Sequence, residues 1–206
     1  AVAGMALVDK PQGWTSAKAV YLMRARIKAK SAGHSGTLDP LATGLLQVFF
    51  GEATKVIPYL EGEKEYTATA LFGVETDSHD RDGKVLREVP VQSLDRERLV
   101  SGLATFQGKT SQVPPKISAT HFQGERAYKL SRQGVDVPMK AKEVDIREIE
   151  MTSLEGPRMG FRVVCSRGTY LRAIIRDLGD MIGIPGILES IRRVRIGRFR
   201  VEDALD

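Results

Sequence analysis

Two periods alternate in the hydrophobic pattern of this chain, that of the β-strand and that of the α-helix. From Tyr66 to Phe72 every second residue is apolar, which predicts a strand over Lys64–Gly73 with one buried face. Between Asp95 and Phe106 the apolar residues fall at i, i+4 and i+7, which predicts an amphipathic helix. Further strands are expected at Met5–Lys10, Leu45–Phe50, Val144–Leu154 and Phe161–Cys165, and further helices from Thr15 or Ser16 to near Gly33, at Glu52–Leu60, at Glu125–Gln133 and from about Thr169 to Gly183.

These elements follow one another without a strict strand-helix alternation and without a Gly-rich phosphate loop. The order favours an α+β fold with a mixed, mainly antiparallel central sheet flanked by helices. With 206 residues the chain is long enough for one large domain or two small ones. Pro114-Pro115 breaks the chain, and residues 114–143 are polar, basic and rich in turn-forming residues.

The charge of the chain suits a polyanionic partner. Its formal net charge is +5 and its sequence pI is near 9.4, although many ordinary enzymes are as basic. The distribution is more informative, because two segments carry clustered cations. These clusters are Lys18, Arg24, Arg26, Lys28 and Lys30, and Arg192, Arg193, Arg195, Arg198 and Arg200. They predict phosphate contacts along a folded RNA, and two solvated basic faces are the alternative.

Nothing in the sequence predicts a membrane or secreted protein. No apolar run approaches the ~20 residues of a membrane span. Residues 1–8 lack the charged start and long apolar centre of a signal peptide. The single cysteine, Cys165, cannot form an internal disulfide and suits a buried strand position. We therefore expect a soluble, cytoplasmic protein, and a monomer.

Candidate chemistry is densest in Gly33–Leu46, where an aspartate and a histidine stand among turn-forming and small apolar residues. Gly33, Gly36 and Gly44 permit positive φ or close approach by another backbone. Pro40 disfavours helix at Asp39, so we expect this carboxylate on a loop anchored by the strand that follows. The pattern indicates an active-site loop. The alternative is a turn that Asp39-Pro40 initiates without a chemical role.

The acidic stretch Asp77–Gly83 suggests a metal site, but its spacing does not support one. A calcium loop with glycine at position 6 would place Ser78 at position 1 and Val89 at position 12, where an acidic ligand is required. His34 and His79 stand apart from any second histidine or cysteine at ligand spacing, which argues against zinc. We therefore expect no metal.

The string Gly33–Leu46, GHSGTLDPLATGLL, resembles the central motif GHxGxLDPxAxGxL of the TruB family of pseudouridine synthases. Further resemblance follows in family order along nearly the whole chain, at Lys10–Ser16, Gly51–Lys55, Lys64–Tyr66, Thr76–Gly83 and Arg167–Arg172. The resemblance implies the pseudouridine synthase fold, with residues 1–206 as its catalytic domain and 114–143 as an insertion that grips RNA. Members of the family generally continue into a small C-terminal domain of the PUA type, which we expect to be absent here.

The resemblance also assigns roles to individual residues. Asp39 would be the catalytic nucleophile, with Arg172 as its partner. Tyr66 would stack on the target base and assist proton transfer. Without the resemblance, Tyr66 would be a core aromatic and Arg172 a surface arginine. The remaining substrate-binding residues implied are His34, Asp80 as the partner orienting His34, Tyr170 lining the site, and Arg126 and Arg132 in the insertion, with Arg193 expected from its basic cluster.

The implied activity is the isomerisation of uridine 55 in the T loop of tRNA to pseudouridine, with base flipping and no cofactor. Its partner would be the T arm of tRNA. Three alternatives stay open from the sequence. One is a guide-dependent relative acting in a ribonucleoprotein, and another is a non-catalytic module that folds tRNA. The third is a carboxylate glycosidase that uses Asp39 with Asp77, Asp80 or Asp82, which would not need the basic clusters.

Overall fold

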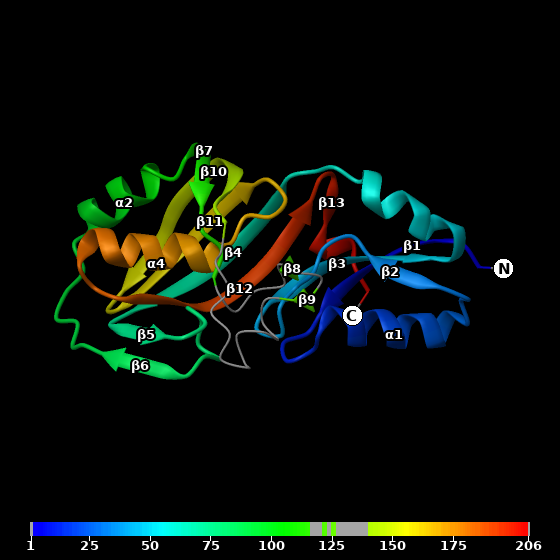
Figure 1. Cartoon of the computed structure of the whole chain (residues 1–206), viewed down its shortest axis with the longest axis horizontal. Coiled ribbons are helices and arrows are strands. Elements are labelled where there is room, and N and C mark those ends of the chain that lie inside the picture. The colour runs from blue at the N-terminus through cyan, green and yellow to red at the C-terminus, as the bar shows by residue number, and fades with distance from the viewer. Residues whose placement is uncertain (1, 116–120, 123–124, 127–139, 206) are drawn as a thin grey trace. The chain divides into compact units, whose positions relative to one another are not determined.

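The computed structural model describes residues 2–115, 121–122, 125–126 and 140–205, drawn in colour in Figure 1. Contacts between Cα atoms divide the chain into two compact units. The first comprises Ala1–Thr67 and Ser190–Asp206, and the second comprises Ala68–Glu189. Strands β4 (Lys64–Phe72) and β12 (Gly186–Ile196) each contribute residues to both units. The catalytic domain expected over 1–206 would include both.

In the first unit the sheet is built on β3. Strands β1 (Gly4–Lys10) and β2 (Ala32–His34) pair with it antiparallel, whereas β12 pairs with it in parallel at Thr43 and Gly44. Strand β13 pairs antiparallel with β12. The bounds of the other elements are β3 Thr43–Phe50, the 3₁₀ helix η1 Gly51–Tyr59, β13 Phe199–Arg200 and the 3₁₀ helix η2 Val201–Asp203.

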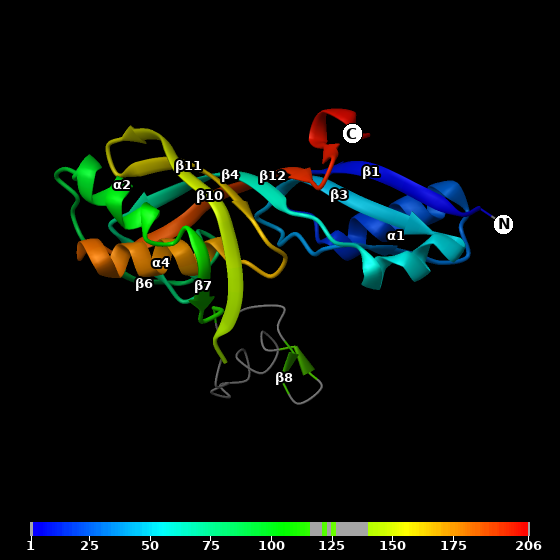
Figure 2. The same cartoon turned by 90° about the horizontal axis from the view of Figure 1, so that it is seen from above.

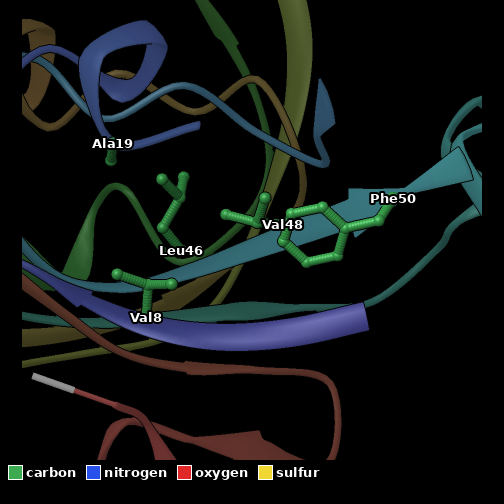
Figure 3. Close-up of a cluster of buried hydrophobic side chains, with 5 residues drawn as sticks. All are labelled: Val8, Ala19, Leu46, Val48 and Phe50. Atoms are coloured by element: carbon green, nitrogen blue, oxygen red, sulfur yellow. The ribbon is translucent and has the colours of Figure 1, made fainter. Parts of the chain in front are cut away.

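Helix α1 (Ser16–Ile27) covers this sheet and closes a small core. Figure 3 shows Val8, Ala19, Leu46, Val48 and Phe50, all buried. Partly buried hydrophobic residues of the helix pack against them, and these include the predicted stripe Val20, Met23 and Ile27. Val8 of β1 and every second residue of β3 from Leu46 to Phe50 therefore pack against residues at helical spacing on α1.

The ends of α1 test the prediction for this helix. Thr15 is its N-cap, and its hydroxyl accepts a hydrogen bond from the Lys18 N–H at 3.1 Å, as predicted. The predicted end near Gly33 is wrong, because the helix stops at Ile27. Lys28 adopts a left-handed conformation with φ 56°, and its N–H bonds back to Ala25. The chain is thereby turned toward β2.

In the second unit the strands follow the order β4, β11, β10, β7. Strand β10 pairs antiparallel with both of its neighbours. Helices α2 and α4 pack side by side, and α2 also contacts β10 (Figures 1 and 2). The bounds are β5 Val74–Thr76, β6 Val85–Glu88, α2 Arg96–Ala104, β7 Gly108–Gln112, β8 His121–Phe122, β9 Glu125–Arg126, β10 Lys142–Glu155, β11 Arg158–Cys165 and α4 Leu171–Ile182.

The architecture confirms the predicted α+β class with mostly antiparallel strands. One predicted helix is wrong over the part of it that the structure describes. Glu125–Gln133 was expected to be helical, yet Glu125 and Arg126 form β9, which pairs with β8. Residues 127–133 of that prediction lie outside the described residues. Cys165 is buried in β11, as predicted, and no helix in the described part of the chain is long and apolar enough to cross a membrane.

Burial in the first core gives a test of the packing. Leu46 is fully buried in β3, whereas Leu22 of α1 is 41% exposed. Leu46→Ala should lower the free energy of unfolding by about 2 to 5 kcal/mol, because it removes methyl groups and leaves a cavity. Leu22→Ala, the matched control, should change it by no more than about 0.5 kcal/mol. Urea denaturation of both variants measures the difference, and equal losses would contradict the packing described here.

Candidate active site

Asp39 stands on the loop between β2 and β3, and its side chain is exposed. Its carbonyl accepts a hydrogen bond from the Ala42 N–H at 2.9 Å, which closes a tight turn. The Ser16 hydroxyl holds the preceding residue, Leu38, from both sides: it donates to the Leu38 carbonyl at 3.0 Å and accepts from the Leu38 N–H at 2.8 Å. Pro40 is tied to the same segment, since the Gly13 N–H donates to its carbonyl at 2.8 Å. The carboxylate is thus presented to solvent on a fixed backbone.

Two glycines of this loop make close contacts, and the one at Gly44 is with backbone. A Cβ on Gly44, which has φ +102°, would lie 2.2 Å from the carbonyl oxygen of Arg193. A Cβ on Gly36 would lie 2.7 Å from the Lys64 ammonium. The predicted close approach by another backbone is confirmed at Gly44. At Gly36 the neighbour is a buried charged side chain instead.

Buried cations lie near the Asp39 loop. Lys10 is fully buried, and its ammonium donates hydrogen bonds to the carbonyls of Pro11 at 3.0 Å and Trp14 at 2.6 Å. Burial lowers the pKa of Lys10 to about 8, the charge of Asp39 opposes this shift, and Arg193 adds to it. Lys64, on the buried face of β4, is the third cation. Positive charge therefore accumulates beside the one carboxylate of the loop.

Arg193 is buried in the protein interior, although its basic cluster predicted a contact with RNA phosphate. The guanidinium is fully buried, so the prediction of an exposed phosphate contact at this residue is wrong in its placement. Its Nε donates to the Leu45 carbonyl at 2.7 Å and its Nη2 to the Gly36 carbonyl at 3.1 Å. The cations of the first basic cluster, by contrast, are all exposed, namely Lys18, Arg24, Arg26, Lys28 and Lys30.

Other arginines of the second basic cluster are also paired within the fold. Arg192 lies 2.6 Å from the Asp9 carboxylate, and Arg195 lies 2.8 Å from that of Glu65. Both pairs are only partly exposed. The interpretation of this cluster as a solvated or phosphate-binding face therefore does not hold for its first three arginines.

His34 and Tyr66 also belong to the first unit. His34 ends β2, opposite Val48, and its ring is partly buried. Tyr66 lies on the buried face of β4 and is 8% exposed, so the predicted alternation of this strand is confirmed. Their roles toward a substrate stay predictions.

In the second unit, Asp80 and Arg172 form a buried pair with a separation of 3.4 Å. Asp80 also accepts hydrogen bonds from the Ser78 hydroxyl at 2.6 Å and the Asp82 N–H at 3.1 Å. Burial raises the pKa of the Asp80 carboxyl, and the Ser78 hydroxyl and Arg172 oppose that shift. Arg172 further donates to the Ser78 carbonyl at 3.0 Å, so it is an interior residue and not a surface arginine. Its expected pairing with Asp39 stays a prediction, as does that of Asp80 with His34.

His79, between Ser78 and Asp80 in the sequence, has an unusual backbone conformation. Its φ is 59°, in the left-handed region, and its carbonyl accepts from the Leu188 N–H at 3.0 Å. Burial lowers the pKa of His79, and the charges of Arg176 and Arg172 lower it further. His79 is therefore held neutral near neutral pH, which avoids a further cation beside Arg172.

Tyr170 precedes α4 and is fixed by a residue that sequence reasoning missed. The Tyr170 N–H donates to the side-chain oxygen of Gln112 at 3.0 Å, and the Gln112 amide donates back to the Tyr170 carbonyl at 3.5 Å. Gln112 is buried at the end of β7, a strand too polar to be recognised by alternation. Of the two arginines expected in the insertion, Arg126 contributes its backbone to β9, and Arg132 lies outside the described residues.

Within the described ranges, no group of three or more histidine, cysteine or carboxylate side chains is arranged to hold a metal ion. In the first unit, the exposed carboxylate of Asp39 is a group that can act as a nucleophile, and the buried phenol of Tyr66 is one that can stack or transfer a proton. In the second unit, Asp80 holds the guanidinium of Arg172 as a fixed positive charge.

The lowered pKa of Lys10 makes stability depend on pH. Between about pH 8 and the model-compound value of 10.5, the folded state binds fewer protons at this residue than the unfolded chain does. Stability should therefore rise with pH through this window, because the cost of burying the charge is fully present below it. Lys10→Met should flatten this rise in the free energy of unfolding measured by urea titration. Lys142→Met, at an exposed lysine of β10, should leave it unchanged, and equal slopes in all three proteins would contradict the burial of the Lys10 charge.

The family model described as TruB family pseudouridylate synthase (N terminal domain) matches residues 24–171. A tRNA pseudouridine synthase B from Nitrosococcus oceani is 42% identical over 203 residues, which cover 98% of this chain and 66% of the relative. Another from Francisella philomiragia is 40% identical over 205 residues, or 98% of this chain and 68% of the relative. The chain thus spans about two thirds of the length of these curated relatives.

Two solved structures resemble this chain in fold over nearly its whole length. A chain in the crystal structure of a Cbf5-Nop10-Gar1 complex superposes with a TM-score of 0.74 and 27% identity, covering 96% of this chain and 50% of that one. A chain in an H/ACA RNP bound to a substrate RNA containing 2′-deoxyuridine has a TM-score of 0.69 and 25% identity, covering 96% and 48%. Together with the motif around Asp39, these matches place the chain in the TruB family of pseudouridylate synthases.

Proposed function

We propose that this chain isomerises uridine 55 in the T loop of tRNA to pseudouridine, with Asp39 as the nucleophile. The observation that carries the proposal is the exposed Asp39 carboxylate on a backbone tied at Leu38, Pro40 and Ala42. A nucleophile needs such presentation, because a misplaced reactive group loses most of its advantage. The relatives named tRNA pseudouridine synthase B supply the choice of tRNA as substrate.

The reaction is an isomerisation in which atoms balance without a cofactor. The bond between N1 of uracil and C1′ of ribose breaks, and a bond between C5 and C1′ forms. The hydrogen on C5 passes to water, and N1 takes a proton. Asp39 attacks either the ribose carbon or the base and is released unchanged at the end.

Other residues of the site would act around that carboxylate. Tyr66 stacks on the flipped base and assists proton transfer. Arg172, held by Asp80 at 3.4 Å, supplies a positive charge paired with Asp39. His34 and Tyr170 line the substrate site. These roles are inferred from the resemblance, and the burial of Tyr66 and Arg172 supports them, because partly desolvated groups interact more strongly with a bound base.

Recognition of the T arm would rest on phosphate contacts. The exposed cations of α1 and of the segment that follows it form a basic surface, and Lys18 lies 4.3 Å from the ring centroid of Trp14. Flipping the uridine costs roughly a few kcal/mol, which stacking and phosphate contacts offset. Arg126 and Arg132 of the insertion are proposed to hold the RNA as well. We propose a cytoplasmic monomer.

The guide-dependent alternative is supported by the similarity in fold between this chain and chains in the two solved complexes. The relatives named tRNA pseudouridine synthase B are more similar in sequence, at 42% against 27% identity, which favours the guide-independent form. A tRNA-folding module without catalysis would not need Asp39. A glycosidase would release free uracil.

The bond chemistry gives the decisive test. RNA carrying tritium at C5 of the target uridine should lose the label to water in the presence of the wild-type chain, without metal, nucleotide or guide RNA. Asp39→Asn should abolish this release while leaving RNA affinity within a few-fold, because phosphate contacts set most of the affinity. Asp145→Asn, at an exposed aspartate of β10, is the matched control and should be fully active.

Each alternative gives a different result in this assay. A folding module releases no tritium, and a glycosidase produces labelled uracil. A guide-dependent enzyme stays inactive until guide RNA and partner proteins are added. If Asp39→Asn kept about a tenth of the wild-type rate, Asp39 could not be the nucleophile, since loss of such a group costs several orders of magnitude.

The basic surface predicts a salt dependence. Affinity for a T-arm hairpin should fall steeply with salt, and Arg24→Ala or Lys28→Ala should each reduce the slope of log affinity against log salt by up to about one unit. Arg87→Ala is the control, because Arg87 is also exposed but pairs with Glu75 at 3.1 Å in the second unit. Filter binding over a range of salt concentrations measures the slopes. Equal slopes for Arg24→Ala and Arg87→Ala would mean that α1 is simply a solvated face.

A further inference from the structure

We propose that Arg193 is a positioning residue that fixes both ends of the loop carrying Asp39. It contacts no substrate, and its effect on catalysis would pass through the backbone of that loop. The inference rests on the proposed function, because it assigns a purpose to the position of Asp39. Nothing in the sequence motifs singles out this residue from its arginine neighbours.

The first support is the reach of one side chain across the loop. Gly36 precedes Asp39 in the loop, and Leu45 follows it in β3. The Arg193 guanidinium donates to the carbonyls of both, from Nη2 at 3.1 Å and from Nε at 2.7 Å. Because a guanidinium is planar and rigid, these two bonds fix the separation of the two carbonyls.

The main chain of Arg193 makes a second connection to the same loop. In the parallel pairing of β12 with β3, Arg193 lies opposite Gly44. The approach is so close that a Cβ on Gly44 would lie 2.2 Å from the Arg193 carbonyl oxygen. The strand that carries the guanidinium is therefore seated against the end of the loop, and side chain and backbone act on it together.

The third support is the electrostatic cost of this arrangement. Arg193 is fully buried, and within the described part of the chain its Nη1 has no hydrogen-bond partner. A second buried cation, Lys10, lies close enough for its pKa to be lowered by Arg193. An apolar side chain of similar size would avoid the desolvation of this charge, so stability alone does not account for an arginine here. A role in fixing the Asp39 loop accounts for it.

Direct binding of RNA phosphate is an alternative role for Arg193. It requires an accessible guanidinium, whereas Nη1 and the whole side chain of Arg193 are inaccessible. A purely structural role is the remaining alternative. It predicts loss of stability without a specific loss of turnover.

The test compares Arg193→Lys with Arg158→Lys. Lysine keeps the charge but has a single ammonium in place of the planar fork, so it cannot hold the Gly36 and Leu45 carbonyls from two separate, rigidly spaced nitrogens. Arg158, in β11, also makes a forked contact, with Glu189 at 2.9 Å, but its partner is a carboxylate and not a carbonyl of the Asp39 loop. Arg193→Lys should lower kcat for tritium release by about 10- to 100-fold, the range for a small misplacement of a reacting group, with KM within about twofold. Arg158→Lys should leave both unchanged.

Amide hydrogen exchange gives a readout that does not need activity. The Ala42 N–H reports the loop, because it donates to the Asp39 carbonyl at 2.9 Å, and the Leu38 N–H reports its other tie, to Ser16 at 2.8 Å. In Arg193→Lys these amides should exchange faster while that of Val48, in the core of β3, does not. If wild-type protein released no tritium, the proposed function would fail, yet the exchange result would still decide whether Arg193 holds the loop.

Arg193→Met covers the case in which Arg193→Lys does not fold, because it removes the buried charge together with the bonds to Gly36 and Leu45. It should also lower kcat with little change in KM. Normal kcat in a folded Arg193→Lys variant would overturn the proposal. So would uniformly faster exchange across the first unit with a matching fall in thermal stability, because that is the signature of a structural role. If Arg193→Lys does not fold, normal kcat and unchanged Ala42 and Leu38 exchange in Arg193→Met would overturn it.

Discussion

The structure of the first unit depends on the burial of a guanidinium that must find carbonyl partners inside the protein. A charge taken out of water is tolerated only where hydrogen bonds replace its hydration. For Arg193 those partners are the main-chain carbonyls of Gly36 and Leu45. A change in the loop between them would break one bond to a desolvated charge. The conformation that presents Asp39 is thus linked to the folding of β12 onto β3.

The two units differ in how they hold a carboxylate, since Asp80 of the second is buried and Asp39 of the first is exposed. Asp80 is buried and is compensated by Arg172, the Ser78 hydroxyl and a main-chain N–H, which together limit the rise of its pKa. Asp39 is exposed, and the charge near it belongs to the buried ammonium of Lys10. The first arrangement fixes an arginine in place. The second leaves a carboxylate exposed, which is the accessibility that a nucleophile requires.

Local patterns predicted the elements whose burial alternates and missed those whose role is electrostatic. Tyr66 to Phe72 follows the strand period, and Thr15 caps α1, so β4 and the start of this helix could be predicted. Strand β12 could not, because its arginines look like a surface cluster until the partners of Arg192 and Arg193 are known. The roles of Gln112 and Ser16 were missed for a related reason. Their side chains hydrogen-bond residues far along the chain, Tyr170 and Leu38, and no local spacing in the sequence reveals such bonds.

Net charge is therefore a poor guide to how this protein would meet RNA. The formal charge of +5 counts Lys10, Lys64 and Arg193 together with the exposed cations of α1. Counterion release depends only on cations that reach phosphate from solvent. The buried set contributes nothing to that release, since its charges are already bonded to carbonyls or set within the core, as Lys10 and Arg193 show. The same residue types thus divide by burial into a surface suited to hold RNA and an interior set that shapes the loop on which the reaction would occur.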